Sequence, residues 1–355
     1  MLFRLGELFC GPGGLGLGAK MAAVSGAGIS HVWATDSDRD SCRTYENNLN
    51  PQKTICEDIR GLDFGKLKSI GDVDALSFGF PCNDFSVVGK KNGVAGGFGA
   101  LYTYCVEAVA YFRPKWFFAE NVGGIRSADE GNTLEAILKA FMECGYKTYP
   151  HLYSFDNYGV PQRRKRVIIV GIRDDFPMDF NIPSPAPFKN TDISAKHALR
   201  KISNSAFNNE LTAQSKTVIE RLEHIKPGQN AFTADLPENL RLNINGAKIS
   251  LIYRRLHPDK PAYTITGSGG GGTHVYHWDE PRALTNRERA RLQSFPDNFI
   301  FCGHKESVRK QVGMAVPPRG ARVIFESILK SFIGKKYASV SANMQIPALP
   351  VAENF

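Results

Sequence analysis

Short apolar runs alternate with longer mixed segments over the first 170 or so residues, and no other feature of the chain limits its fold as strongly. Each run has the length of a β-strand, and the intervening segments have the length of helices or loops. This alternation predicts an α/β fold with a doubly wound, mostly parallel sheet covered by helices. The predicted strands are Leu5–Phe9, His31–Thr35, Val73–Phe78, Lys115–Ala119 and Arg166–Gly171.

The chain changes character after Arg173. Residues 174 to about 253 are rich in Pro, Asn, Lys and Ser and have weak periodicity, which predicts a second, smaller, loop-rich domain. Thr285 to Leu292 is predicted to be a helix, with Thr285 and Glu288 forming a capping box. A last helix is predicted from Pro317 to about Ile333. The expected segments are a first domain over 1–173, a second over 174–282, a stretch over 283–335 that returns to the first domain, and a tail over 336–355.

Composition and charge narrow the class of protein. The seven cysteines are scattered and form no C-x-x-C pair, which argues against disulfides and zinc clusters and for a reducing, intracellular setting. The N-terminus lacks the pattern of a secretory leader, and no apolar run reaches the length of a membrane span. The formal charge of +9 favours a polyanionic partner such as nucleic acid, although a basic surface without a partner fits equally well.

A glycine-rich loop at residues 7–18 follows the first predicted strand and opens the first predicted helix. Its glycines allow a ligand to approach the backbone, and the helix N-terminus offers N–H donors. The loop alone fits a dinucleotide, a nucleotide, S-adenosylmethionine or a tight turn. Asp36, at the end of the second strand, is spaced to bind ribose hydroxyls, with a helix cap as the alternative. Asp58 could accept a bond from an adenine amino group while Ile59 packs on the ring.

Cys82 is a candidate nucleophile because it lies on a polar loop after a predicted strand, where the ligand crevice of a doubly wound sheet is found. Pro81 stiffens the backbone before it. Glu120 ends the next apolar strand and is expected at the same edge of the sheet, although it could equally be a capping acid. The other cysteines are interpreted as small buried hydrophobes, namely Cys10, Cys56, Cys105, Cys144 and Cys302.

A basic run from Arg163 to Arg166 leads into the last predicted strand. If Arg166 enters a strand, Arg164 and Arg166 share one face, while Arg163 and Lys165 share the other. One face could then reach a reaction centre and the other a phosphate backbone. A basic run is more often a solvated surface, but this one adjoins an apolar strand.

Taken together and in order, these pieces resemble the DNA (cytosine-5) methyltransferases. The resemblance covers residue 5 to about residue 330. The segments that carry it are 9–14, Asp36, 58–59, 81–82, 120–122, Gln162-x-Arg164-x-Arg166, 282–296 and 313–318. It implies an S-adenosylmethionine-dependent, Rossmann-like fold and methyl transfer to C5 of cytosine in double-stranded DNA, with S-adenosyl-L-homocysteine as the product and no metal.

The resemblance also implies the roles of individual residues. Cys82 would bond to C6 of a flipped cytosine, Glu120 would hold N3 and the exocyclic amine, Arg164 would orient Glu120, and Arg166 would help to place the thiol loop. The implied cofactor residues are Phe9, Gly11, Gly13, Gly14, Asp36, Ser37, Asp58, Ile59, Pro81 and Leu101. The implied DNA-binding residues are Ser86, Gln162, Thr264, Gly269 and Gly270.

Two departures from the family pattern stand out. Phe80 and Asn83 flank the Pro-Cys pair where the family has proline and glutamine, from which we expect altered packing but intact chemistry. Met314 replaces an asparagine, which removes an amide that could bind the methionine part of the cofactor. The size of the chain and the family suggest a cytoplasmic, nucleoid-associated prokaryotic monomer that is paired with a restriction endonuclease.

Three other functions stay open. A transfer-RNA cytosine methyltransferase would use the same chemistry, but it would need less of a recognition domain. A nicotinamide-dependent oxidoreductase would use the glycine loop but would leave Cys82, Glu120 and Arg164 without a role. A catalytically silent DNA-binding relative stays open because of Met314.

Overall fold

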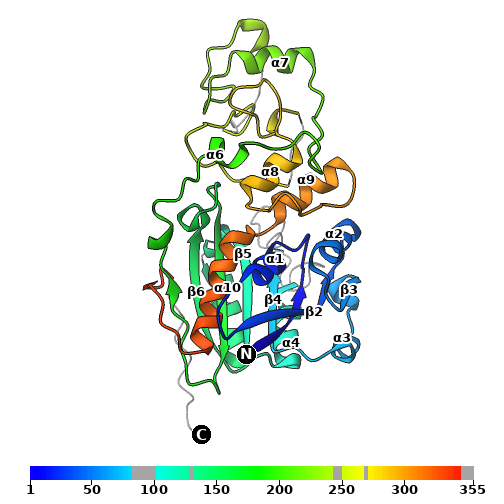
Figure 1. The fold of residues 1–355 in the computed structure, drawn as a ribbon, viewed down its shortest axis with the longest axis vertical. Helices are drawn as coiled ribbons and strands as arrows, with labels where there is room; N and C mark the ends of the chain where they lie inside the picture. Colours follow the sequence, from blue (N-terminus) through cyan, green and yellow to red (C-terminus); the bar gives the residue numbers. More distant parts are fainter. Residues whose placement is uncertain (82–100, 128–130, 243–249, 268–270, 345–355) are drawn as a thin grey trace. The chain divides into compact units, whose positions relative to one another are not determined.

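The computed structural model describes residues 1–81, 101–127, 131–242, 250–267 and 271–344, and these form two compact units (Figure 1). The sheet unit contains the described residues of 1–154, 165–187 and those from Gly320 onward. The loop-rich unit contains those of 155–164 and 188–319. Residues 283–319 therefore lie in the loop-rich unit, and the chain re-enters the sheet unit at Gly320, later than the expected boundary at residue 283.

The sheet unit is built on seven strands in the order β3-β2-β1-β4-β5-β7-β6. β7 runs antiparallel to both of its neighbours, and the other neighbouring strands are parallel. This confirms the predicted mostly parallel, doubly wound α/β fold. β6 was not among the predicted strands. The strands are β1 (Leu2–Leu8), β2 (Gly28–Asp36), β3 (Lys53–Cys56), β4 (Ala75–Gly79), β5 (Trp116–Val122), β6 (Tyr146–Ser154) and β7 (Lys165–Arg173).

Helices cover both faces of this sheet because the buried strands carry apolar side chains on both sides. On β5, the ring of Phe117 contacts Phe141, whereas the ring of the next residue, Phe118, stacks on Phe325. Phe141 lies on α5 and Phe325 on α10, so these two helices pack on opposite faces. The helices of the unit are α1 (Gly14–Met21), α2 (Arg39–Leu49), α3 (Phe64–Ile70), α4 (Leu101–Phe112), α5 (Asn132–Glu143) and α10 (Pro318–Phe332).

Part of the expected tail is tied to the sheet unit. Ser339–Val340 forms β9, which pairs with β8 (Ile182–Pro183). The side chain of Asn343 accepts a hydrogen bond from the Leu152 N–H and donates one to the Leu152 carbonyl. The interpretation of residues 336–355 as a tail is therefore wrong for this stretch, because its backbone and side chains complete hydrogen bonds at strand edges.

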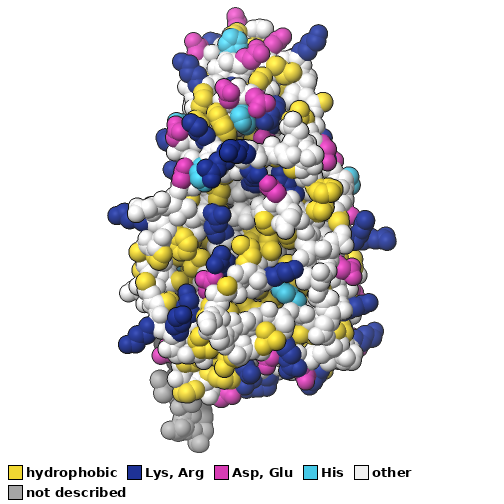
Figure 2. Space-filling model, in the orientation of Figure 1, with side chains coloured by type: hydrophobic (Ala, Val, Ile, Leu, Met, Phe, Trp, Pro, Cys, Tyr) yellow, Lys and Arg dark blue, Asp and Glu magenta, His cyan; other side chains and the backbone are white. Residues whose placement is uncertain are grey.

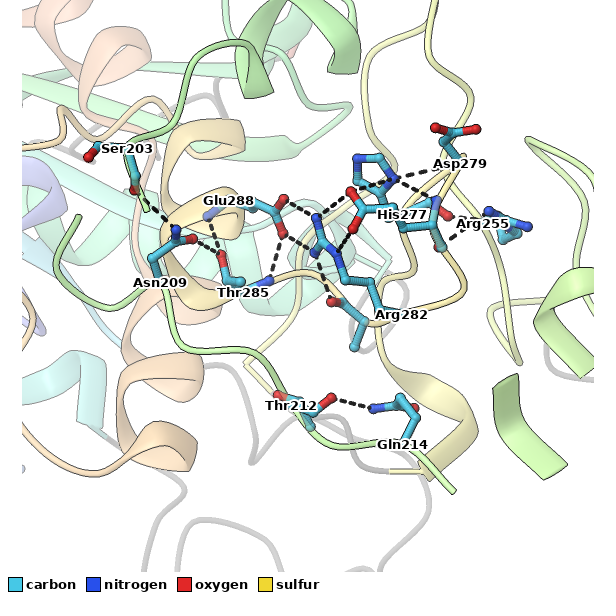
Figure 3. A network of polar contacts seen from close by, with 12 residues as sticks. Ser203, Asn209, Thr212, Gln214, Arg255, His277, Asp279, Arg282, Thr285 and Glu288 are labelled. Carbon is cyan, nitrogen blue, oxygen red and sulfur yellow. Dashed lines mark hydrogen bonds and ion pairs between the residues drawn. The ribbon is translucent and has the colours of Figure 1, made fainter. Parts of the chain in front are cut away.

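The loop-rich unit has short helices joined by irregular backbone. Its helices are α6 (Ala195–Leu199), α7 (Lys216–Glu223), α8 (Asn286–Leu292) and α9 (Lys305–Met314). The predicted capping box at the start of α8 is confirmed: Thr285 Oγ1 accepts from the Glu288 N–H, and Glu288 accepts from the Thr285 N–H. Arg282 binds Glu288 with two hydrogen bonds of 2.8 Å (Figure 3). α9 was not predicted.

Buried arginines replace regular secondary structure as hydrogen-bond partners in this unit. Irregular backbone leaves carbonyls without partners, and a guanidinium supplies five donors. Arg287 is fully buried and donates to the carbonyls of Phe207, Pro296 and Phe299. Arg255 donates to four other carbonyls in the same way. These side chains hold the loops at fixed positions. None of the described helices combines the length and hydrophobicity that a bilayer crossing requires.

Gly313→Ala is expected to destabilise the loop-rich unit. A Cβ at Gly313 would lie 2.0 Å from the Gly267 nitrogen and 2.1 Å from the Thr266 carbonyl carbon, and backbone atoms cannot move aside as a side chain can. Overpacking of this kind costs about 1–3 kcal/mol, more than the roughly 1 kcal/mol that alanine adds to a helix.

Urea unfolding would measure this loss. Gly124→Ala is the control, because nothing lies within 4 Å of a Cβ built there. Equal midpoints for Gly313→Ala and the wild type would show that α9 moves away from the 266–267 backbone without cost.

Candidate active site

The glycine loop is shaped by residues with positive φ. Phe9, Gly11 and Gly13 have φ values of 50°, 52° and 94°, and Gly13 is the N-cap of α1. A Cβ on Gly13 would lie 2.6 Å from Leu49 Cδ1, so α2 packs closely behind the loop. The loop turns sharply after β1 because glycine tolerates this conformation.

Asp36 holds the glycine loop in place. Its Oδ2 accepts a 2.8 Å hydrogen bond from the Gly11 N–H, and its Oδ1 accepts one of 2.8 Å from the Asp38 N–H. The N-cap of α2 is Asp38, whose Oδ1 accepts from the Ser41 N–H, and not Asp36.

A pocket of about 370 Å³ opens between the glycine loop and the carboxyl ends of the neighbouring strands. This volume lies in the range of small-molecule sites. Seven of its ten lining residues are candidates taken from the sequence, and the other three are Thr35, Glu57 and Arg60. The lining residues are Phe9, Thr35, Asp36, Ser37, Glu57, Asp58, Ile59, Arg60, Pro81 and Leu101.

Sequence reasoning missed Arg60. Its Nε and Nη2 bind the two oxygens of Asp58 at 2.8 and 2.6 Å, and the Arg60 N–H also donates to Asp58. The hydrogen bond from the Arg60 side chain is the main cause that lowers the pKa of Asp58 to about 2. Asp58 is thus a carboxylate, and a ligand amino group that donates a hydrogen bond to it would also lie next to the Arg60 guanidinium. The signal available in the sequence was a cation two residues after the acid.

Glu7 is a second group that sequence reasoning missed. It lies within β1 and is 1% exposed, and its Oε2 accepts a 3.0 Å hydrogen bond from the Tyr45 hydroxyl. His31 Nδ1 lies 3.1 Å from the same hydroxyl. Burial, as the largest cause, raises the pKa of Glu7 to about 8. The carboxyl therefore carries a proton at neutral pH. A Cβ on Gly16 would lie 2.9 Å from Glu7 Oε2, so this carboxyl group packs directly against α1, just after the glycine turn.

Glu7→Gln is expected to flatten the pH dependence of stability. The unfolded carboxyl loses its proton near pH 4.5 and the folded one near pH 8. Wild-type stability from this group is therefore complete below the unfolded pKa and declines as the pH rises through the folded pKa. Glutamine keeps the volume and the acceptor for Tyr45 without the titration.

Thermal unfolding between about pH 5 and pH 8 would measure this effect, and the melting temperature of the wild type should fall more steeply than that of the variant. The exposed Glu107 on α4 serves as the control, as Glu107→Gln. Parallel curves for Glu7→Gln and the wild type would contradict the prediction.

Glu120 and Arg166 form an ion pair at the sheet edge. Glu120 Oε1 lies 2.7 Å from Arg166 Nε, and the two side chains are 12% and 13% exposed. Glu120 lies in β5 opposite Gly79 of β4, and a Cβ on Gly79 would lie 3.0 Å from Glu120 Oε2. Glycine at this position therefore leaves room for the carboxylate. The family resemblance implied that Arg164 orients Glu120. In the structure, the arginine that contacts Glu120 is Arg166.

Asn121 fixes the backbone that leads to the candidate nucleophile. Its Nδ2 donates a 3.1 Å hydrogen bond to the Phe80 carbonyl, and its Oδ1 accepts from the Val122 N–H. Phe80 is buried near Phe78. The side chain found here where the family has proline is therefore part of the apolar core. Pro81 then lines the pocket. Four candidates lie outside the described residues: Cys82, Ser86, Gly269 and Gly270.

The remaining candidates lie in the loop-rich unit. β7 begins at Lys165, so Arg164 lies outside that strand; it is buried and donates to the carbonyls of Ile265 and Met314. Thr264 Oγ1 donates to the Arg163 carbonyl at 2.6 Å and is half-buried.

The prediction that Gln162 contacts DNA is wrong in this structure. The Gln162 side chain is fully buried, donates to Gln293 Oε1 at 2.8 Å and accepts from the Ile265 N–H. Its amide is used to join two segments of the unit, which leaves no surface for a ligand.

Two expectations on cysteines and metals can be compared with the described residues. Cys10 and Cys105 are buried as expected, but Cys144 and Cys302 are only partly buried, and Cys56 is exposed because it ends the edge strand β3. Within the part of the chain that the structure describes, no three His, Cys, Asp or Glu side chains are grouped to hold a metal ion.

Comparison with known proteins decides the family. The family model of the C-5 cytosine-specific DNA methylases matches residues 3–330. This chain belongs to that family. The DNA methylase chain is 51% identical to the Type II methyltransferase M.BbvI of Brevibacillus brevis, over 96% of this chain and 95% of that protein. It is 42% identical to M.NgoFVII of Neisseria gonorrhoeae, over 92% of this chain and 86% of that protein.

Solved structures of other proteins have the same fold as this DNA methylase. A prophage-encoded E. coli protein described as a DNA modification methyltransferase has a TM-score of 0.74 at 22% identity and covers 93% of this chain and 99% of that one. The S. pombe Dnmt2 methyltransferase has a TM-score of 0.61 at 18% identity over the same shares. The enzyme class is therefore DNA (cytosine-5-)-methyltransferase, and enzymes of this class use S-adenosylmethionine.

Proposed function

We propose that this DNA methylase methylates C5 of cytosine within one short double-stranded DNA sequence, through a covalent bond between Cys82 and C6. The observation that carries the proposal is the pairing of Glu120 with Arg166 beside the backbone held by Asn121. That backbone continues through Pro81, at the rim of the pocket, directly into Cys82. Because Cys82 follows Pro81 directly in the sequence, we expect its thiol near this carboxylate, at the strand ends where the crevice of such a sheet lies.

Cys82 would act as the nucleophile. C5 of cytosine is unreactive until a thiolate adds to C6, which divides one difficult step into two easier ones. The cofactor supplies an electrophilic methyl group when bound. Loss of the C5 proton then lets the Cys82–C6 bond break and returns the thiol to the enzyme.

Glu120 would hold the cytosine ring as electrons move into it. One of its oxygens faces Arg166, and the other lies over Gly79. A carboxyl group held in this way can donate its proton to N3 and accept a hydrogen bond from the exocyclic amine, which draws electron density away from C6. Arg166 is a positioning residue, since the charge-assisted contact of its Nε with Oε1 restrains the Glu120 carboxylate. Arg164 would act through the carbonyls of Ile265 and Met314.

The pocket of the sheet unit fits S-adenosylmethionine. Asp36 offers acceptors for ribose hydroxyls, Asp58 for the adenine amino group, and Phe9, Ile59 and Leu101 offer apolar surface. The turn through Gly11, Gly13 and Gly14 would leave room for the methionine part, and Ser37 would add a hydroxyl. We assign these nine residues, with Pro81, to cofactor binding.

Recognition of DNA is assigned to the loop-rich unit and the loop after Cys82. A base inside a duplex is out of reach, so the cytosine must flip out, which costs a few kcal/mol. Ser86 and the residues up to 100 would close over the duplex. Thr264, Gly269 and Gly270 would face DNA, because glycines permit close approach to phosphates and bases.

We further propose that the enzyme is a monomer and protects host DNA from a partner endonuclease of a restriction–modification system. The two relatives named above are Type II methyltransferases, and this chain covers most of their length. An endonuclease that cuts at the same sequence, and that is blocked by methylation with this enzyme, would support the pairing.

Transfer of a tritiated methyl group from S-adenosylmethionine to mixed-sequence duplex DNA tests the function, with bisulfite sequencing to locate 5-methylcytosine. Label clustered at one short sequence is the expected result. Label in total transfer RNA but not in DNA would identify an RNA enzyme. No label in either nucleic acid would overturn the proposal and favour a silent DNA-binding relative.

A further inference from the structure

A second pocket lies within the loop-rich unit. Its volume is about 170 Å³, and a water needs only about 10–15 Å³ of such space, so the pocket admits a much larger group. It is lined by several cationic side chains and by no carboxylate. The lining residues are Arg163, Gly228, Arg254, Arg255, Leu256, His257, Lys260, Pro261 and Tyr263.

Arg254 is held in position at this pocket. Its guanidinium carbon lies 4.8 Å from the centre of the Tyr263 ring, and the Tyr263 hydroxyl donates to the Arg254 carbonyl at 3.0 Å. Stacking on an aromatic ring restrains a guanidinium without using its N–H donors. Arg254 is therefore both oriented and able to bind an anion.

Arg163 and Lys260 add exposed charges from restrained backbone. The Arg163 N–H donates to the Ala262 carbonyl at 2.8 Å, and the Arg163 carbonyl accepts from Thr264. The Lys260 carbonyl accepts from the Ala195 N–H. Among the described residues, no carboxylate lies within ion-pair distance of Arg163, Arg254 or Lys260. Three cations thus surround one pocket without a carboxylate to neutralise them.

The interior behind the pocket is also positively charged. Arg289 is 2% exposed, and its Nε has no hydrogen-bond partner. Both Arg289 and Arg254 act electrostatically on Tyr263, and both lower its pKa against the larger effect of burial, which raises it. Buried charges are screened less than surface charges, so Arg289 raises the potential in the pocket. On the face shown in Figure 2, Lys and Arg side chains lie among Asp and Glu side chains.

We propose that this pocket binds a phosphate group of the DNA backbone, with Arg254 as the principal ligand and Arg163 and Lys260 at the rim. The inference rests on the proposed function, because it assumes that DNA is the substrate. Two exposed cations that line the pocket together with a restrained arginine suit the phosphates of a DNA backbone better than a single ion. Contacts of this kind set the position of the protein on the duplex without reading sequence.

The salt dependence of duplex binding tests the inference. The affinity for a duplex that contains the unmethylated target sequence is measured between about 50 and 200 mM salt. The proteins compared are the wild type, Arg254→Gln and Lys260→Gln. We expect Arg254→Gln to weaken binding about tenfold at low salt and to reduce the slope of log K against log salt by about 1. Affinity should fall equally for target and unrelated duplexes. Lys66→Gln on α3, a loss of the same charge from an exposed side chain, is the control.

Three outcomes are informative. An unchanged salt slope in both pocket variants would overturn the inference; Lys260→Gln covers the case in which Arg254→Gln fails to fold, because Lys260 is exposed. Stabilisation of the wild type, but not of Arg254→Gln, by inorganic phosphate together with an unchanged DNA slope would show a free-phosphate site, which also overturns it. Pocket-dependent DNA binding without methyl transfer by the wild type would support the pocket and contradict the proposed function alone.

Discussion

Cys82→Ala is expected to abolish methyl transfer to DNA while cofactor binding stays within about twofold of the wild type. Loss of a nucleophile removes the covalent route, and such losses cost on the order of 10⁴–10⁶ in turnover. The backbone before Cys82 is fixed by the hydrogen bond from Asn121 to the Phe80 carbonyl, and alanine does not disturb it. Single-turnover transfer of a tritiated methyl group measures the loss.

A trapped adduct distinguishes a nucleophile from a structural thiol. A duplex with fluorine at C5 of the target cytosine cannot lose that atom as a proton, so the wild type should remain bonded to it and shift on a denaturing gel. Cys82→Ala should give no shift. Cys144→Ala, at the end of α5, is the control and should be trapped like the wild type. An adduct formed by Cys82→Ala would assign the nucleophile to another residue.

Glu120→Gln is expected to lower kcat by about 10²- to 10⁴-fold with little change in cofactor affinity. Glutamine has the same shape but cannot give a proton to N3, and it loses the ion pair with Arg166. Arg166→Lys keeps the charge without the fork, so it should fall between the wild type and Glu120→Gln. If Arg166 only positions Glu120, the effects of the two substitutions should be far from additive in the double variant.

Steady-state kinetics at saturating DNA and cofactor separate this effect from weaker binding. Glu135→Gln, in the exposed first turn of α5, removes the same charge away from the site. A kcat for Glu120→Gln within about threefold of the wild type would contradict the assigned role, because general acid–base and electrostatic contributions are larger than that.

Local patterns were enough to predict much of this protein. The apolar runs predict five of the seven strands of the sheet. A strand that is buried on both faces has an almost continuous apolar sequence, which is easy to recognise. The capping box of Thr285 and Glu288 spans four residues and needs no distant partner. The pocket contains Asp36, Asp58 and Pro81 because strand ends, which are visible in the sequence, gather at one edge of such a sheet.

Long-range contacts explain what the sequence did not reveal. β6 was missed because its mixture of polar and apolar residues is not typical of a buried strand. Its pairing with β7 at the edge of the sheet is visible only in the structure. Gln162 was predicted to bind DNA, yet it spans about 130 residues to reach Gln293 inside the loop-rich unit. Glu7 gives no sign in the sequence of the burial that raises its pKa.

The basic run from Arg163 to Arg166 illustrates both sides of this contrast. Its charge, and its place before a strand, could be recognised from residue types and spacing. Its division could not: Arg163 lines the pocket of the loop-rich unit, Arg164 is buried there, and Arg166 pairs with Glu120 in the sheet unit. Residue types and short spacings therefore identify the family and the candidate chemistry, whereas the partner of each arginine lies in a distant part of the chain and is known only from the tertiary structure.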